Sequence, residues 1–136
     1  MTKLTAGLIL GLLLLGGCSQ GDKSANSASS DPYAGLNDMV LAWKTELAAT
    51  DPSCKQAPAG EKCEMFQVSC KAQRTITPDE AAKGVTAKLV ADIGWSGFDD
   101  KGQGRPASAA ALFTKSGGTW TRSPTKPVNP ETCADL

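Results

Sequence analysis

Five cysteines divide this chain and limit what it can fold into. Cys18 directly follows an apolar run near the N-terminus, whereas Cys54, Cys63, Cys70 and Cys133 lie in the remaining part of the chain. A small domain has a modest hydrophobic core and is commonly strengthened by covalent cross-links. An even set of cysteines in a small exported domain is typical of disulfide bonds. The chain is therefore expected to form a cross-linked domain if it is exported.

The first eighteen residues have the organisation of an export signal. Lys3 precedes a short apolar run, and small residues precede Cys18. The apolar segment 4–17 is too short to cross a bilayer, because a spanning helix needs about 20 apolar residues. Its last four residues, Leu15-Gly16-Gly17-Cys18, resemble the lipobox of bacterial lipoproteins.

This resemblance implies an address and an anchor. Residues 1–17 would be removed as a signal peptide, and Cys18 would become a mature N-terminus carrying diacylglycerol and a further acyl chain. Two or more acyl chains hold a protein durably on a bilayer. Ser19 follows the cysteine, and in Gram-negative lipoproteins a serine there favours the outer membrane over the inner one. The resemblance thus predicts a protein of the cell envelope, on the periplasmic face of the outer membrane of a Gram-negative bacterium, with the lipid bilayer as its first partner.

The mature chain divides into a tether and one domain. Residues 18–30 comprise the lipidated cysteine and a polar stretch, QGDKSANSASS, that cannot bury enough apolar surface to offset its ordering entropy. Residues 31–136 suit a single small domain. Without residues 1–17 the chain carries 13 basic side chains (14 minus Lys3) and 14 acidic ones. This balance argues against a nucleic-acid partner, which needs a basic surface.

Geometry ranks the possible disulfide pairings. Cys63 and Cys70 flank a predicted strand and would lie about 20 Å apart, whereas a bridge needs Cα atoms about 5.5 Å apart. Cys54 and Cys63 flank a turn-rich loop, so the first choice is Cys54–Cys63 with Cys70–Cys133. The pairing of Cys54 with Cys70 and of Cys63 with Cys133 stays open as the second choice. No C-x2-C pair is present, so neither a zinc site nor a redox pair is predicted.

One helix and four strands are expected. Asp31-Pro32 is a suitable helix start, and apolar residues then recur at helical spacing up to Thr50. Strict alternation predicts strands at Glu64–Ala72 and Val85–Trp95, followed by strands at Ala107–Thr114 and Thr119–Arg122. Residues 77–83 resemble a capping box followed by one helical turn, with a loop as the alternative.

The pattern also predicts where side chains lie in the first strand and in the last hairpin. In the first strand, Phe66, Val68, Cys70 and Ala72 are expected on one face. A hairpin turn at Ser116-Gly117 or over 115–118 would place Phe113 opposite Trp120.

These elements predict an α+β fold, with one N-terminal amphipathic helix packed on a four-stranded antiparallel meander that disulfides hold together. The plan is similar in outline to cystatin-like or NTF2-like domains, a likeness of architecture that carries no function.

The chain contains no histidine, which removes Ser-His and Cys-His nucleophile pairs and the commonest metal ligand. No cofactor or metal site is predicted. The predicted binding surface is the long loop between the second and third strands, since aromatic residues and arginine are enriched at interaction sites. Its candidate residues are Trp95, Phe98, Asp99, Asp100 and Arg105.

We therefore expect an envelope lipoprotein with a non-catalytic binding domain for an envelope protein or a glycan. A small hydrolase that uses carboxylates alone is the first alternative, because Asp79-Glu80 and Asp99-Asp100 are adjacent acids. A structural subunit of an envelope complex is the second.

Overall fold

The computed structural model describes residues 31–136, so the predicted signal peptide, Cys18 and the tether lie outside the described residues. Four strands form one antiparallel sheet in the order β1-β2-β3-β4, which confirms the predicted meander. The elements in chain order are α1 (Leu36–Thr50), α2 (Pro52–Lys55), β1 (Glu64–Gln73), α3 (Pro78–Ala82), β2 (Val85–Phe98), β3 (Gly104–Ser116) and β4 (Thr119–Pro124).

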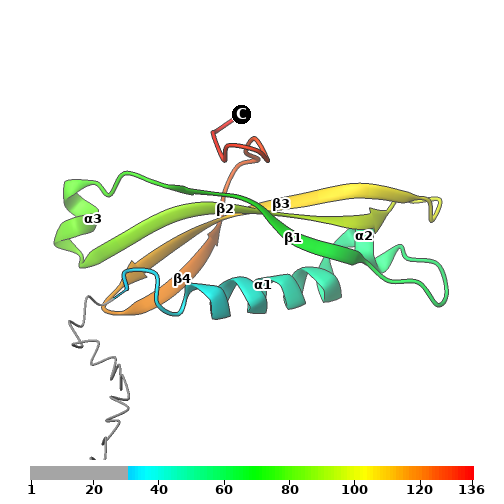
Figure 1. The fold of residues 1–136 in the computed structure, drawn as a ribbon, viewed down its shortest axis with the longest axis horizontal. Helices are drawn as coiled ribbons and strands as arrows, with labels where there is room; N and C mark the ends of the chain where they lie inside the picture. Colours follow the sequence, from blue (N-terminus) through cyan, green and yellow to red (C-terminus); the bar gives the residue numbers. More distant parts are fainter. Residues whose placement is uncertain (1–30) are drawn as a thin grey trace, which may run out of the picture.

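The two faces of the sheet are covered differently. Helix α1 lies along one face, and the C-terminal tail, residues 125–136, lies against the opposite face (Figure 1). Alternate residues of the central strand β2 point to the helix side. There they are buried together with Leu36 and Trp43 of α1 and with Trp120 of β4. The buried residues of this main core are Leu36, Trp43, Ala87, Leu89, Ala91, Ile93, Trp95, Ala111, Phe113 and Trp120.

Helix α1 begins later than the sequence suggests, and it is one of three helices in the described residues rather than a single N-terminal one. The side chain of Asp31 accepts a hydrogen bond from the Tyr33 backbone N–H at 2.9 Å, which closes a turn before the helix. Gly35 then adopts a left-handed conformation with φ of 83°, and the helix starts at Leu36. Trp120 fixes this entry, because its indole N–H donates to the Ala34 carbonyl at 2.9 Å.

Aromatic contacts hold α1 on the sheet. Trp43 meets Phe113 edge-to-face with ring centroids 5.7 Å apart, an arrangement that stabilises aromatic pairs beyond their buried area. The Arg122 guanidinium lies 5.5 Å from the centre of the Trp43 ring and forms two hydrogen bonds with the Glu46 carboxylate. The arginine of β4 therefore joins the helix to the edge of the sheet.

Both disulfides of the first-ranked pairing are present. Cys54 and Cys63 are joined with Cα atoms 5.2 Å apart, and Cys70 and Cys133 are joined with Cα atoms 5.6 Å apart. The first closes the loop between α2 and β1. The second ties the C-terminal tail to the side of the sheet that α1 does not cover, where Cys70, Val90, Val128 and Cys133 form a small second core.

The predicted face assignment of β1 is wrong, because the strand contains two irregularities in its pairing with β2. Val68 pairs with Ile93 and Cys70 with Asp92, so one residue of β1 is extra. Such a bulge reverses the alternation after it. Phe66 consequently packs against the main core, whereas Cys70 and Ala72 belong to the second core on the other face.

The predicted pairing of Phe113 with Trp120 is also wrong. Gly117 and Gly118 both have positive φ and form the two-residue turn, so Ser116 pairs with Thr119. Trp120 therefore lies opposite Lys115, and Phe113 lies opposite Arg122.

Candidate functional site

The predicted binding surface is not brought together by the fold. Trp95 and Phe98 are only 5% and 8% exposed. Trp95 stacks on Phe66 at 5.4 Å and donates its indole N–H to the Ser53 hydroxyl at 3.0 Å. Both aromatic residues are therefore core residues, because β2 stays buried through its last two residues.

The acidic residues of the same loop serve the turn itself. One carboxylate oxygen of Asp99 accepts hydrogen bonds from the backbone N–H groups of Lys101 and Gln103, at 2.9 and 2.8 Å. Asp100 is exposed beside it. Arg105 and Trp95 border one groove of the surface and Phe98 borders another, but of these three residues only Arg105 is exposed.

The other adjacent acids also have a structural explanation. Thr77 and Glu80 form the reciprocal hydrogen bonds of a capping box at the start of α3. The Lys88 ammonium lies 2.6 Å from the Glu80 carboxylate, and this hydrogen bond, together with that of the Thr77 backbone, lowers the pKa of Glu80 to about 2. A carboxyl with so low a pKa is ionised at neutral pH and is unsuited to act as a general acid.

A groove of about 690 Å³ lies on the sheet face that α1 leaves uncovered. Its floor is the row in which Gly94 of β2 stands opposite Ser108 of β3, next to Ser69 of β1. Gly94 leaves room for Ser69 here, because a Cβ atom at position 94 would lie 3.0 Å from the Ser69 hydroxyl oxygen. Pro130 of the C-terminal tail forms part of the wall. The tail, held by the Cys70–Cys133 disulfide, thus closes one end of the groove.

Asp92 lies under this closed end, one row beyond Gly94 on the same face of β2. It is 2% exposed, and its Oδ2 atom has no hydrogen-bond partner. Burial raises the pKa of Asp92, and hydrogen bonds from the hydroxyls of Ser69 and Ser108, which line the groove, oppose this effect. A buried carboxyl that lacks one partner is costly and calls for a functional explanation.

Arg105 borders the opposite end of the groove. This side chain is exposed, and it takes part in none of the three ion pairs found among residues 31–136. Arg105 pairs with Gly97, five residues along β2 from Asp92, which corresponds to about 16 Å of strand. Because this separation is an odd number of residues, strand alternation directs Arg105 and Asp92 to opposite faces of the sheet.

Met65 stands on the rim of the groove. It is 75% exposed, the second most exposed of the four large apolar side chains that are exposed in the described chain, and its backbone has φ of 56°. A left-handed conformation at a residue other than glycine is strained, and such residues concentrate at functional sites. The bulge next to Met65 turns this apolar side chain out beside the groove.

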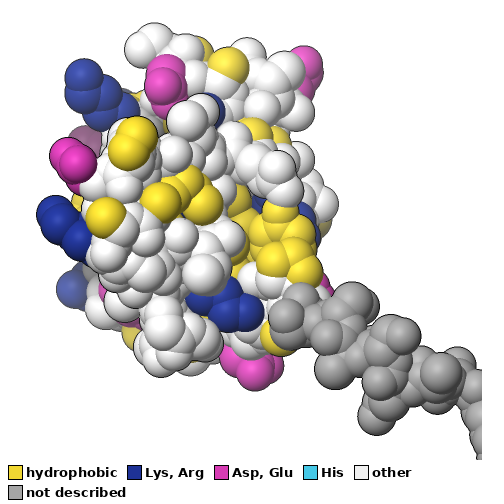
Figure 2. Space-filling model, turned by 90° about the vertical axis from the view of Figure 1, so that its left-hand side faces the viewer, with side chains coloured by type: hydrophobic (Ala, Val, Ile, Leu, Met, Phe, Trp, Pro, Cys, Tyr) yellow, Lys and Arg dark blue, Asp and Glu magenta, His cyan; other side chains and the backbone are white. Residues whose placement is uncertain are grey.

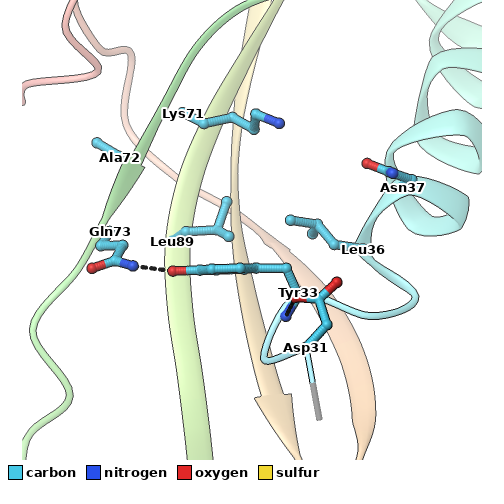
Figure 3. A pocket seen from close by; sticks show the side chains of 8 residues that line it. All are labelled: Asp31, Tyr33, Leu36, Asn37, Lys71, Ala72, Gln73 and Leu89. Carbon is cyan, nitrogen blue, oxygen red and sulfur yellow. Dashed lines mark hydrogen bonds between the residues drawn. The ribbon is translucent and has the colours of Figure 1, made fainter. Parts of the chain in front are cut away.

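A second, smaller cavity of about 330 Å³ opens between the start of α1 and β1, on the other face of the sheet (Figure 3). The buried side chains of Leu36 and Leu89 line it on the inside. Tyr33 closes one side, and its hydroxyl accepts a hydrogen bond from the Gln73 amide. Tyr33 and Gln73 are thus paired with each other, and Asn37 and Lys71 are the other polar residues that line the cavity with Asp31.

The described chain begins at the end of the molecule that carries α3 (Figure 1). Viewed from that end, hydrophobic side chains gather in the middle and next to the first described residues, with charged side chains around them (Figure 2).

The sequence pattern does not indicate the groove, because the residues that line it are small and distant along the chain. Asp92 falls on the polar face of β2 in the alternating pattern, where an aspartate at a solvated position is expected. The glycine at position 94 is the one signal in the sequence, since a glycine inside a predicted strand is typical of a close approach or an irregular point.

No protein-family profile, curated protein sequence or solved structure matches this chain. In residues 31–136, no helix is long and apolar enough to span a bilayer. Within the same part of the chain, no three His, Cys, Asp or Glu side chains are grouped so that they could hold a metal ion.

Proposed function

We propose that this protein is a lipid-anchored lipoprotein of the bacterial cell envelope, whose domain binds another envelope component in the groove on its open sheet face. The observation that carries the binding function is the groove itself, and Asp92, whose buried Oδ2 atom has no partner, lies one row beyond its floor on the same strand. The anchor rests on the resemblance of Leu15-Gly16-Gly17-Cys18 to a lipobox.

The point at which the chain enters the domain supports a definite orientation on the membrane. Residues 19–30 could span at most about 40 Å between an acylated Cys18 and Asp31. The domain would be tethered by the end that carries α3, seen in Figure 2. The groove runs along the strands on a lateral face and would stay accessible to a partner in the same compartment.

The disulfides support export. Cys133 is completely buried against Cys70, and the wall of the groove depends on this link. Disulfides of this kind persist in oxidising compartments such as the periplasm and are rare in the cytosol. The proposed address and the covalent structure of the site are therefore consistent.

The anchor is tested by the intact mass of the protein extracted from native membranes. A mature terminus at Cys18 with acyl adducts is the expected result, and Cys18→Ala is expected to shift the protein out of the membrane fraction. A chain that keeps residues 1–17, or a terminus without lipid, would refute the anchor.

Binding in the groove is tested by photocrosslinking in intact cells, with p-benzoylphenylalanine in place of Met65. The matched control carries the same group in place of Leu41, which is 62% exposed on α1, on the other side of the sheet. A discrete adduct from position 65 that is absent from position 41 is expected. Equal labelling from both positions, or none from position 65, would contradict binding in the groove.

A further inference from the structure

We infer that the cavity between the start of α1 and β1 binds a monocarboxylate with an apolar chain of about ten carbon atoms. The cavity lies on the other face of the sheet from the groove, so this inference goes beyond the proposed binding function and does not depend on it. It uses three features of the cavity: a lysine on the inner face of β1, an apolar floor, and a size that suits a small ligand.

The bulge of β1 brings polar side chains to the inner face of the sheet. Beyond the bulge, Lys71 pairs with Ala91. Two residues further along, Gln73 pairs with Leu89. Residues directly opposite each other in an antiparallel pair share a face, and both partners on β2 belong to the main core under α1. Lys71 and Gln73 therefore lie on the helix side, at positions that apolar side chains usually occupy in a sheet covered on that side.

The floor and the size of the cavity suit an apolar chain. Leu36 and Leu89 are buried in the main core and line the cavity from the inside. A chain that covers them removes apolar surface from water, which favours binding. The cavity measures about 330 Å³, which is room for about ten non-hydrogen atoms if each takes the volume of a water molecule in the liquid.

One end of the cavity offers hydrogen-bond donors to a carboxylate. In Figure 3 the Lys71 side chain extends from β1 toward α1, and the Asn37 amide points from α1 toward it. Lys71 takes part in none of the three ion pairs found among residues 31–136. The ammonium and the amide both carry N–H donors, and a carboxylate that accepts from an ammonium forms a charge-assisted hydrogen bond, which is stronger than a neutral one.

The other end of the cavity disfavours a second negative charge. Asp31 lies on the far side of the two leucines from Lys71, and its Oδ1 atom accepts a hydrogen bond from the Tyr33 backbone N–H (Figure 3). The Tyr33 hydroxyl is paired with the Gln73 amide, which leaves the apolar ring of Tyr33 along this side. A ligand with one carboxylate therefore binds with that group at Lys71 and with its chain directed toward Tyr33.

The test uses the protein extracted from native membranes and held in lipid nanodiscs. The two probes are decanoate and its uncharged counterpart decanamide, each with a photoreactive diazirine at the far end of the chain. After irradiation, mass spectrometry of the digested protein locates the adducts. Adducts of the decanoate probe are expected at or next to Tyr33, about tenfold more abundant than those of the decanamide probe, which is the effect of one charge-assisted hydrogen bond. Equal labelling by the two probes, or adducts scattered over the protein, would overturn the inference.

Variants of Lys71 separate binding of the carboxylate from packing of the chain. Lys71→Met keeps an unbranched side chain without the charge and is expected to remove the preference for decanoate over decanamide. Lys71→Arg keeps the charge and is expected to retain the preference. Lys83→Gln, an exposed cation directly after α3, is the matched control and is expected to change nothing. The probes partition into the bilayer equally with every variant, so partitioning does not affect this comparison.

The remaining outcomes have definite meanings. A preference that persists in Lys71→Met would contradict the inference, and so would adducts at Lys71 or Asn37 in place of Tyr33. Photocrosslinking from position 65 probes the groove alone. Adducts in the cavity without any from position 65 would support this inference and contradict the proposed function, and the converse result would contradict this inference alone.

Discussion

Trp95 and Ser53 are joined by a hydrogen bond from the indole N–H to the serine hydroxyl, 3.0 Å long and buried. The same hydroxyl donates to the Asp51 carboxylate at 2.7 Å, and Asp51 also caps the short helix α2. This chain of contacts fixes α2 against the end of β2. It also explains why Trp95, a candidate for binding in the sequence, is a structural residue of the core.

Gly97 is expected to be required for this arrangement. A Cβ atom at position 97 would lie 2.5 Å from the Ser53 hydroxyl oxygen and 2.8 Å from the Ser53 Cβ atom. We predict that Gly97→Ala lowers the free energy of unfolding by about 1–3 kcal/mol, the usual cost of overpacking a close contact. Urea unfolding followed by tryptophan fluorescence measures the change.

The control for this variant is Gly104→Ala, since a Cβ atom at position 104 would have no neighbour within 4 Å. Its effect is expected to stay within about 0.5 kcal/mol. Removal of the obstructing hydroxyl in the double variant Gly97→Ala, Ser53→Ala should recover part of the lost stability. A Gly97→Ala variant as stable as the original protein would show that α2 is not held in this position.

The two disulfides are expected to contribute unequally to stability. Cys70–Cys133 closes a loop with a sequence separation of 63, and Cys54–Cys63 closes one of 9. Loop-closure entropy then predicts a loss of about 4 kcal/mol when the first is replaced by two alanines and about 2.5 kcal/mol for the second. Thermal unfolding of the two double variants compares these losses.

The same variants test the wall of the groove. Without the Cys70–Cys133 link, the tail is held by Val128 and by the hydrogen bonds from Arg74 to the Cys133 carbonyl and to Asp135. Faster hydrogen exchange is expected over residues 128–135, with little change in α1. Unchanged exchange in the tail would mean that these weaker contacts hold it alone.

The acid stability of the domain should depend on Glu80. The pKa of Glu80 is about 2 in the folded protein, below its ordinary value of 4.5, because Lys88 and the Thr77 backbone donate to its ionised form. This contribution to stability is fully present above about pH 4.5 and is lost as the pH falls toward 2. Glu80→Gln is therefore expected to flatten the acid limb of the stability profile between these values.

Thermal unfolding between pH 2 and 7 measures this dependence. Asp79→Asn is the matched control, because Asp79 is adjacent, exposed and in none of the ion pairs found in residues 31–136. It should leave the acid limb steep. An equally steep acid limb in Glu80→Gln would assign the dependence to other carboxylates.

The sequence predicted the strands well because their alternation is a direct consequence of burial on one side of the sheet. The predicted run Val85–Trp95 of β2 is the longest, and its alternate positions from Ala87 to Trp95 are buried, whereas Val85 is half-buried. The disulfide pairing could also be predicted from the sequence, since the length of β1 excludes a bridge between Cys63 and Cys70.

The alternating sequence pattern alone does not predict the irregularities of the sheet. Whether a strand of ten residues contains a bulge depends on the fit of its side chains to the neighbouring strand, as at Ser69, which sits over Gly94. The choice of Gly117-Gly118 for the turn likewise depends on two positive φ angles that follow from the twist of the hairpin. The candidate groove is a product of these irregularities, so its residues could not be grouped from the sequence.

Asp92 should make the stability of the domain fall at higher pH. Burial raises its pKa above the ordinary value of 3.8, so the folded protein binds this proton more tightly than the unfolded chain. The stability then decreases as the pH rises from about 3.8 through the raised pKa, because the charge must be carried in a buried position. We predict that Asp92→Asn increases the melting temperature relative to the original protein at pH 8 and that this gain vanishes near pH 3.5. Differential scanning calorimetry across this range measures the difference, with the exposed substitution Asp100→Asn as the control. A variant that loses stability at pH 8 and is equal to the original protein at pH 3.5 would show that the ionised carboxylate stabilises the empty groove, contrary to the buried environment described for Asp92.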